Sequence, residues 1–215
     1  GQKSSKSLGN VIDPLALVEP YGLDPVRYFL LREVPFGQDG DFSRRALIAR
    51  LNNELANDLG NLAQRTLSLI QRNCDARLPE RTPPTDSDRE LLDAAAALPD
   101  RLRALLDRQA FHEALEQVWT VVRLGNAWID REKPWALRKT DPARMAAVLR
   151  TLHDAMRVLA TVLQPFMPDT MSRMLDQLGV PAEARSLAAL ATPLPGGIAL
   201  PPPAPLFQKI QDPPA

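Results

Sequence analysis

The sequence predicts an all-α protein built as an antiparallel helical bundle. Three observations indicate this fold: apolar residues recur at helical spacing in four long segments, proline-containing connectors separate those segments, and almost no stretch alternates apolar and polar residues as a strand would. Hydrophobic residues make up 45% of the chain and aromatic residues only 5%, which is typical of helices packed on helices. We expect the bundle at residues 43–180, a connecting region at 1–42 and a proline-rich tail at 181–215.

Residues 45–72 carry the clearest helical pattern. This segment contains no proline, and leucine or isoleucine recurs at intervals of three, four and seven, at residues 48, 51, 55, 59, 62 and 69. On a helix that turns about 100° per residue, these intervals form one apolar stripe that must face a core. Asp41 or Ser43 is the expected N-cap.

A polar line runs beside this stripe, about a quarter turn away. It includes Glu54, Asn61 and Arg65, with Asn57 beside it. We expect these side chains at the edge of the core, held in place yet open to a ligand. Asn61 and Arg65 are four residues apart, so a helix presents both on one face, where they could read the edge of a nucleobase. The alternative interpretation is an ordinary solvated helix flank.

Two short helices are predicted before the long one. Asp13 and Asp24 each precede a proline, which is a helix-start signal, and the turn at residues 20–22 and Pro35 end the two helices. These helices offer too little apolar surface to order themselves. We therefore expect residues 1–42 to be only loosely anchored to the bundle.

Three more long helices follow a proline-rich connector at residues 78–86. Asp86 or Ser87 is expected to cap the first, which Pro99 should kink or divide. The second covers residues 111–131, with Trp119 and Trp128 assigned to the core, and the third covers 142–163. A short fifth helix follows at residue 168, and the tail beyond residue 193 should be extended and lie on the surface.

Composition excludes several classes of site. The formal net charge is zero, so any nucleic-acid partner must be held by local patches. Cys74 is the only cysteine, which excludes an intrachain disulfide and fits a reducing cytoplasm. His112 and His153 are the only histidines, and the sequence shows no metal-ligand spacing. No signal peptide is present and the uncharged run at residues 186–208 is broken by prolines, so no membrane partner is expected.

The opening run KSSKSLGNVIDP resembles the KMSKS signature of class I aminoacyl-tRNA synthetases. The next run, YGLDPVRYFLLREVPFGQDGDFS, is similar to methionyl-tRNA synthetases in particular, and LANDLGNLAQR and NAWIDREKPW resemble the anticodon-binding motifs of that family. The likeness extends to the closing PLFQKIQ. One departure is visible, because Ser4 replaces the apolar second residue of KMSKS.

The resemblance implies a two-step reaction in a longer enzyme. Methionine attacks the α-phosphate of ATP, with Mg²⁺ as the cofactor, and the methionyl group then passes to tRNA. The implied catalytic residues are those of the KMSKS-type loop, Lys3, Ser5, Lys6 and Ser7. Lys6 would stabilise the charge that develops on pyrophosphate in the transition state. The catalytic Rossmann core would lie upstream, so this chain is interpreted as a fragment that is inactive alone and is not expected to carry bound ATP or Mg²⁺.

The resemblance also implies a set of residues that bind the CAU anticodon of methionine tRNA: Asn57, Asn61, Arg65, Asp130, Pro134 and Trp135. Proteins recognise RNA loops by stacking splayed bases on aromatic rings and bonding their Watson–Crick edges. Trp135, held by Pro134, would stack on one base, and Asn61 and Arg65 would bond the first base. Two alternatives stay open: a leucine, isoleucine or valine enzyme of the same class, or a non-catalytic helical tRNA-binding protein.

Overall fold

The computed structural model describes residues 13–33 and 43–211, and in these residues the regular structure is helical. The only β contact among them is an isolated bridge between Arg77 and Ala199. The elements in chain order are α1 (Pro14–Tyr21), α2 (Leu23–Glu33), α3 (Arg44–Arg50), the π-helical segment η2 (Leu51–Gly60), α4 (Asn61–Asn73), α5 (Asp86–Ala96), α6 (Leu98–Asp107), α7 (Phe111–Glu132), α8 (Pro134–Leu137), α9 (Pro142–Leu163), α10 (Pro168–Gln177) and the short 3₁₀ turns η3 (Ala182–Ala184) and η4 (Ala188–Ala191). The all-α prediction is confirmed. The boundaries at residues 42 and 180 remain predictions.

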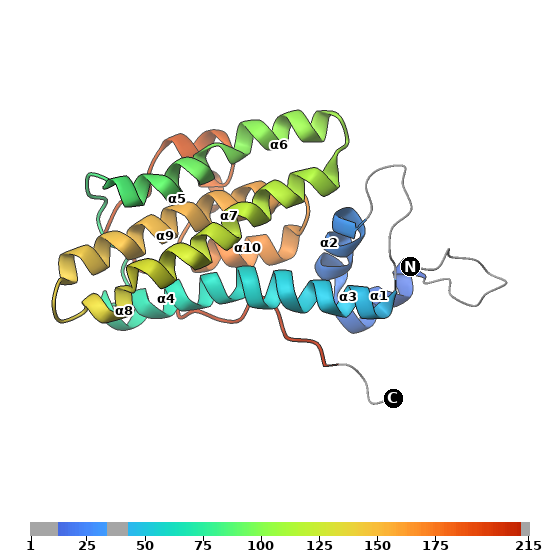
Figure 1. The fold of residues 1–215 in the computed structure, drawn as a ribbon, viewed down its shortest axis with the longest axis horizontal. Helices are drawn as coiled ribbons and strands as arrows, with labels where there is room; N and C mark the ends of the chain where they lie inside the picture. Colours follow the sequence, from blue (N-terminus) through green and yellow to red (C-terminus); the bar gives the residue numbers. More distant parts are fainter. Residues whose placement is uncertain (1–12, 34–42, 212–215) are drawn as a thin grey trace.

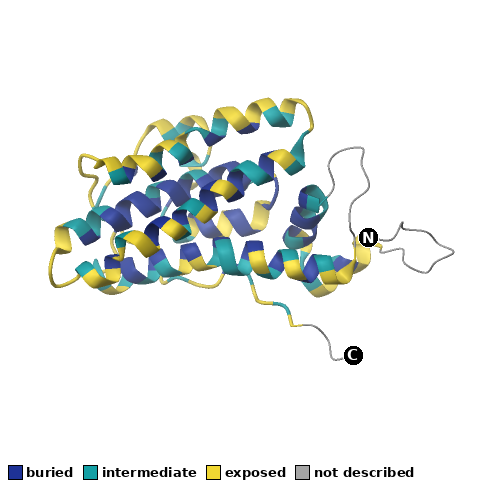
Figure 2. Cartoon of the chain, viewed as in Figure 1, coloured by how far each residue is buried: buried dark blue, intermediate teal, exposed yellow. Residues whose placement is uncertain are grey.

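Successive long elements run in opposite directions, as expected for an antiparallel bundle (Figure 1). α3, η2 and α4 form one continuous helix, α5 and α6 return, α7 runs back, and α9 returns again. α9 lies at the centre and contacts α4 to α8 and α10. Its residues are buried along most of its length, whereas α5 and α6 expose their outer sides (Figure 2). The core is therefore organised around α9.

The long helix departs from α geometry in its middle third. The predicted apolar stripe is confirmed, because all six of its residues are buried, and Ser43 is the N-cap. In η2, however, the backbone bonds residues five apart, so the chain turns less per residue than in an α-helix. Glu54, expected at the edge of the core and open to a ligand, is instead only 4% exposed, because Tyr28 and Arg32 of α2 bond to its carboxylate.

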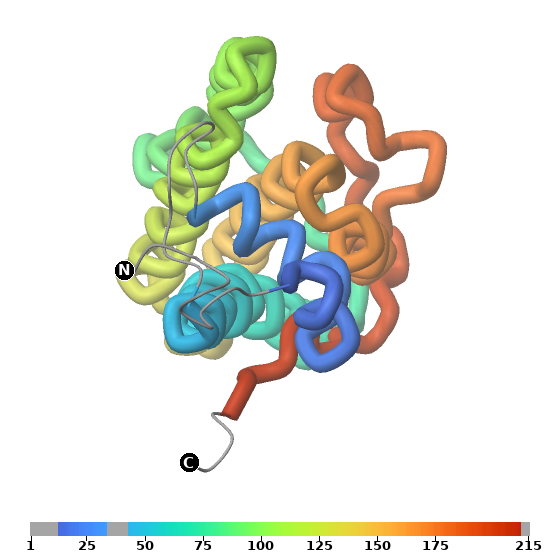
Figure 3. Tube along the Cα trace, turned by 90° about the vertical axis from the view of Figure 1, so that its right-hand side faces the viewer, coloured from blue at the N-terminus to red at the C-terminus, as the bar shows by residue number. Residues whose placement is uncertain are grey.

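α2 is firmly packed, and for this helix the expectation of loose anchoring is wrong. Tyr28 and Phe29 are fully buried, and the Tyr28 ring lies 4.8 Å from the Trp119 ring of α7, centroid to centroid. Arg32 of α2 donates from Nε to Glu54 Oε1 over 3.1 Å. In the end view, α1 and α2 lie across this end of the bundle (Figure 3). Tertiary packing on α7 and η2 supplies the order that two short helices lack alone.

The second half of the bundle matches its predicted elements with one correction. The helix expected from residue 86 is divided at Ala97, close to Pro99. Its cap is Thr85, not Asp86 or Ser87. The Thr85 hydroxyl accepts a hydrogen bond from the amide of Asp88, while the Asp88 carboxylate accepts one from the Thr85 amide. This reciprocal capping box satisfies two amides that the first turn would otherwise leave unpaired.

The C-terminal segment lies on the surface, as predicted, but is fixed to the bundle. Leu194, Leu200 and Leu206 are each buried to 6% exposure. Arginines of α9 hold the backbone of the segment: Arg150 donates to the carbonyl of Leu194 over 2.7 Å, and Arg157 donates to that of Thr192 over 2.8 Å. Among the described residues, no helix combines the length and apolar character that crossing a bilayer requires.

His153 is buried in α9 and makes stability depend on pH. Its Nε2 lies 2.8 Å from the carbonyl of Leu178, so we assign it as the donor in a neutral ring. Burial lowers the pKa of His153 from 6.5 to about 4; the bond to Leu178 opposes this shift, and Arg150 and Arg157 add to it. Below pH 6.5 His153 becomes protonated in the unfolded chain, whereas in the folded chain it stays neutral until the pH approaches 4. Stability from this group is therefore present at neutral pH and is lost as the pH falls toward 4.

We expect this loss to reach about 3 kcal/mol between neutral pH and pH 4, since one pKa unit corresponds to about 1.4 kcal/mol. Urea unfolding at a series of pH values would measure it. His153→Gln keeps a side-chain donor but removes the titration, and should flatten the pH dependence by that amount. Parallel curves for the two proteins would contradict this assignment.

Candidate nucleic-acid interface

The junction between α7 and α8 places one tryptophan at the surface. α7 ends at Glu132, and Lys133 adopts a left-handed conformation with φ of 48°. α8 then starts at Pro134, which suits a first helical position because proline has no N–H to leave unpaired. Pro134 is buried, while Trp135 remains 44% exposed. The expectation that proline fixes an open tryptophan at the end of this helix agrees with this geometry.

Arg65 of α4 links this junction to the long helix. Its Nη2 lies 2.5 Å from Asp130 Oδ1 in α7, and its guanidinium carbon lies 5.4 Å from the centroid of the Trp135 ring, within the range of a cation–π contact. Asn61 is exposed one turn before Arg65 on the same helix. The structure thus brings Arg65, Asp130 and Trp135 into contact, with Asn61 beside them. Asn57 is half-buried in η2 and takes no part in these contacts.

The other two tryptophans belong to the core, as predicted. Trp119 and Trp128 are fully buried, and each indole N–H has a backbone acceptor: the carbonyl of Glu54 for Trp119 and that of Ser87 for Trp128, both at 3.0 Å. A buried indole with a satisfied N–H is a structural group. Trp135 is therefore the only one of the three that offers its ring to a ligand.

Two residues that the sequence reasoning missed set the spacing between α4 and α7. A Cβ at Gly125 of α7 would lie 3.0 Å from Leu62 Cδ2, so glycine allows the two helices to approach closely. Asn126 donates from Nδ2 to the carbonyl of Asp58 over 2.9 Å, which ties α7 to η2. A glycine inside a long helix was the available signal. The role of Gly125 depends on its contact with α4, which the sequence around Gly125 does not show.

The predicted catalytic residues Lys3, Ser5, Lys6 and Ser7 lie outside the described residues. The first described residue, Asp13, precedes α1, which lies at the opposite end of the bundle from α8 (Figure 1). Among the described residues, no group of three or more His, Cys, Asp or Glu side chains is arranged to hold a metal. The groups that the structure brings together at α4, α7 and α8 are an exposed aromatic ring, a guanidinium and an amide, which can stack on and hydrogen-bond a planar ligand.

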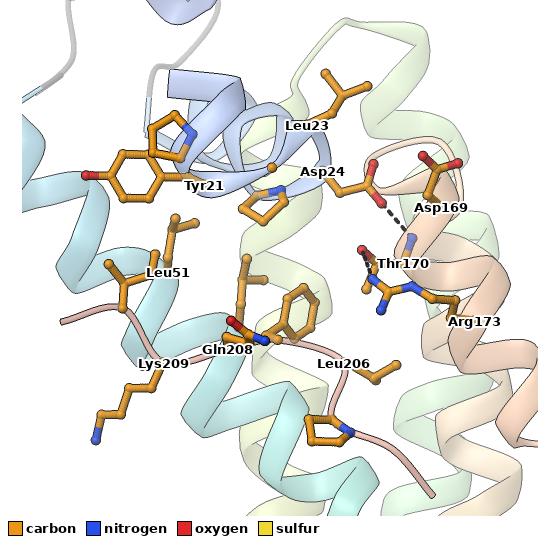
Figure 4. A pocket seen from close by; sticks show the side chains of 17 residues that line it. Tyr21, Leu23, Asp24, Leu51, Asp169, Thr170, Arg173, Leu206, Gln208 and Lys209 are labelled. Carbon is orange, nitrogen blue, oxygen red and sulfur yellow. Dashed lines mark hydrogen bonds between the residues drawn. The ribbon is translucent and has the colours of Figure 1, made fainter. Parts of the chain in front are cut away.

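A cavity of about 590 Å³ lies far from this interface, between the α1–α2 turn, α10 and the C-terminal segment (Figure 4). Two of its polar contacts involve Thr170 of α10. Asp24 Oδ2 accepts from the amide of Thr170 over 2.6 Å, and Arg173 donates to the Thr170 hydroxyl over 3.3 Å. The first of these contacts joins α2 to α10. We therefore treat the cavity as a junction between elements and place the candidate site at α4, α7 and α8.

Comparison with known proteins decides the family. Residues 78–214 match the sequence model described as the anticodon binding domain of methionyl tRNA ligase, and residues 1–67 match that of class I tRNA synthetases (M). The chain belongs to the methionyl-tRNA synthetase family. This result decides against the leucine, isoleucine and valine alternatives. Asp130 and Trp135 fall within the match at residues 78–214, whereas Asn61 and Arg65 fall within the match at residues 1–67.

Individual members of the methionyl-tRNA synthetase family support the assignment. The methionine–tRNA ligase of Brucella suis is 50% identical over 210 residues, covering 97% of this chain and 41% of the relative. The methionine–tRNA ligase of Mycobacterium bovis is 46% identical over 217 residues, covering 99% of this chain and 42% of the relative. The chain therefore spans about two fifths of the length of these relatives.

Solved structures of the family share the fold. The apo crystal structure of Mycobacterium tuberculosis methionyl-tRNA synthetase superimposes with a TM-score of 0.92 at 44% identity, covering 95% of this chain and 42% of that one. The same enzyme bound by methionyl-adenylate gives a TM-score of 0.91 at 45% identity, with coverages of 95% and 41%. The helical arrangement described above is thus that of methionyl-tRNA synthetases.

Proposed function

We propose that this chain is the tRNA-recognition part of a methionine–tRNA ligase, and that its α4–α7–α8 surface binds the CAU anticodon of methionine tRNA. The observation that carries the proposal is the half-exposed Trp135 ring with the Arg65 guanidinium against it. An aromatic ring fixed on a helical scaffold loses little entropy when a base stacks on it. This function fits a family whose matching domain is described as anticodon-binding.

Asn61 and Arg65 supply the hydrogen-bonding edge in this proposal. The Asn61 amide offers both donors and an acceptor, and the Arg65 guanidinium offers five N–H groups. One of these groups is directed to Asp130, which orients the guanidinium and leaves other donors for a base. The first anticodon base, cytosine, presents both a donor and acceptors and can pair with such a set. Asn57, half-buried in the preceding turn, would support Asn61, and buried Pro134 would support Trp135.

The remaining activity belongs to the longer enzyme. There, Lys3, Ser5, Lys6 and Ser7 would bind the phosphates of ATP, with Mg²⁺ as counterion, while methionine is activated. Lys6 would stabilise the pyrophosphate leaving group, because a positioned cation acts most where charge develops. We place this reaction in the cytoplasm, which the single cysteine of the chain fits.

The proposal is tested by binding of anticodon stem-loop RNAs to the chain and its variants. Arg65→Ala should reduce the preference for CAU over a stem-loop with a changed first base by about tenfold or more, since hydrogen bonds to charged groups contribute about 1.5–3 kcal/mol. Asn61→Ala should reduce this preference by roughly fivefold, as expected for a neutral hydrogen bond. Fluorescence anisotropy would give the dissociation constants.

Gln64→Ala is the matched control. Gln64 is exposed on the same helix, and its amide bonds only to its neighbour Ser68, over 3.1 Å, in the described contacts. This variant should bind both RNAs as the wild type does. If Arg65→Ala and Asn61→Ala kept the full preference for the first base, the proposed reading edge would be wrong.

A further inference from the structure

Three basic residues flank Trp135 in the sequence, and no ion pair of theirs is found among the described residues. Lys133 precedes α8, and Arg138 and Lys139 follow it directly. All three are exposed, and none of them has a carboxylate partner among the described residues. Arg138 is the C-cap of α8 and keeps helical φ and ψ of −50° and −42°, so it lies about one turn beyond Trp135, and Lys139 follows it in the next turn. We name Lys133, Arg138 and Lys139 the α8 basic patch.

Nearby carboxylates are already occupied elsewhere. Asp130 pairs with Arg65, and Glu132 pairs with Arg144 over 3.3 Å. Asp141 caps α9 by accepting from the Arg144 amide over 3.1 Å. Residues 130–144 carry five Lys or Arg and three Asp or Glu, in a chain whose formal net charge is zero. The basic excess is therefore local and adjoins the exposed indole.

We propose that the α8 basic patch binds the phosphate backbone of the RNA strand whose base stacks on Trp135. This inference rests on the proposed function and adds a division of labour to it. Contacts to phosphates supply affinity that does not depend on sequence, whereas contacts to base edges and rings supply selectivity. Side chains without a competing carboxylate keep their full charge for a phosphate, while Arg65, tied to Asp130, is oriented for a base.

Counterion release makes this division measurable. A basic side chain that neutralises one phosphate of a single strand adds about 0.7 to the steepness of log affinity against log salt concentration. Loss of one such contact corresponds to about fivefold weaker binding at 0.1 M salt. We expect Arg138→Ala and Lys139→Ala each to show this reduced salt dependence, and Lys133→Ala as well. The loss should be equal for CAU and for altered stem-loops.

Arg101→Ala is the matched control. Arg101 is exposed on α6, on the far side of the bundle from α8, and likewise has no carboxylate partner among the described residues. This variant should keep the wild-type salt dependence. Arg138→Lys preserves the charge and should do the same. Thermal melting should be unchanged in every variant, because these side chains are exposed.

The outcomes separate this inference from the proposed function. If the α8 variants keep wild-type affinity and salt dependence while Arg65→Ala loses CAU preference, only the phosphate role is overturned. If they lose CAU preference without a change in salt dependence, they read bases and the division of labour is wrong. If the wild type shows no CAU preference at all, the proposed function fails, and a reduced salt dependence in the α8 variants would still support phosphate binding.

Discussion

Glu54→Ala is expected to destabilise the protein by about 3–5 kcal/mol, since removing one partner of a buried ion pair leaves an uncompensated charge. Glu54 and Arg32 are 4% and 3% exposed. The Glu54 carboxylate accepts from Tyr28 over 3.0 Å, from Arg32 over 3.1 Å and from Arg50 over 2.6 Å. It is the only carboxylate of the described chain that joins all three, so its loss should leave the Arg50–Glu33 pair as the remaining ion pair between α2 and the long helix.

The pKa of Tyr28 agrees with this environment. Burial, and then the negative charge of Glu54, raise the pKa of Tyr28 well above its ordinary value. The tyrosine therefore stays a neutral donor to the carboxylate at neutral pH. Arg32 also pairs with Glu116 of α7, which is partly exposed and cannot replace Glu54 inside the core.

Urea unfolding at neutral pH would measure the effect, with Asp130→Ala as the control. Asp130 also pairs with an arginine, but its side chain is 63% exposed, so its loss should cost less than about 1 kcal/mol. The double variant Arg32→Met, Glu54→Leu should recover part of the loss, because apolar groups can replace a buried pair. A Glu54→Ala protein as stable as Asp130→Ala would show that the network does not anchor α2.

Trp128→Ala and Trp135→Ala should differ sharply in stability, although the two residues are the same and lie only seven positions apart. Trp128 is fully buried and donates to the carbonyl of Ser87, so truncation should cost about 3–5 kcal/mol. Trp135 is 44% exposed, and its loss should leave the melting temperature close to that of the wild type. Thermal unfolding followed by circular dichroism compares them directly, and equal losses would place Trp135 in the core.

Helix positions and the core could be read from the sequence because they depend on local pattern. The stripe in residues 45–72, the division near Pro99 and the burial of Trp119 and Trp128 all follow from spacing and proline chemistry. The π-helical turn of η2 could not be predicted in this way, since the periodicity argument assumes α geometry throughout. The packing of α2 was missed because its partners, Trp119 and Glu54, lie far along the chain.

The candidate site was likewise predictable only where it depends on local sequence pattern. Pro134 beside Trp135 indicated an exposed ring at a helix end, and the four-residue spacing of Asn61 and Arg65 indicated a shared face. The contact of Arg65 with both Asp130 and Trp135 depends on how closely α4 approaches α7, which Gly125 permits. The distance between α4 and α7 cannot be predicted from a local sequence pattern. Asn126 was missed because its partner is a backbone carbonyl of η2. Every residue has such a carbonyl, so the sequence does not show which one a side chain will bond.

The central claim is that Trp135 is a stacking platform for the anticodon, and the affinity of Trp135→Ala for stem-loop RNAs tests it most directly. Stacking of a base on an aromatic ring contributes about 1–3 kcal/mol, so affinity for the CAU stem-loop should fall by roughly 5- to 150-fold, with most of the preference over altered anticodons lost. The melting temperature should stay near that of the wild type. A Trp135→Ala protein that folds normally and binds CAU with undiminished affinity and preference would contradict the account.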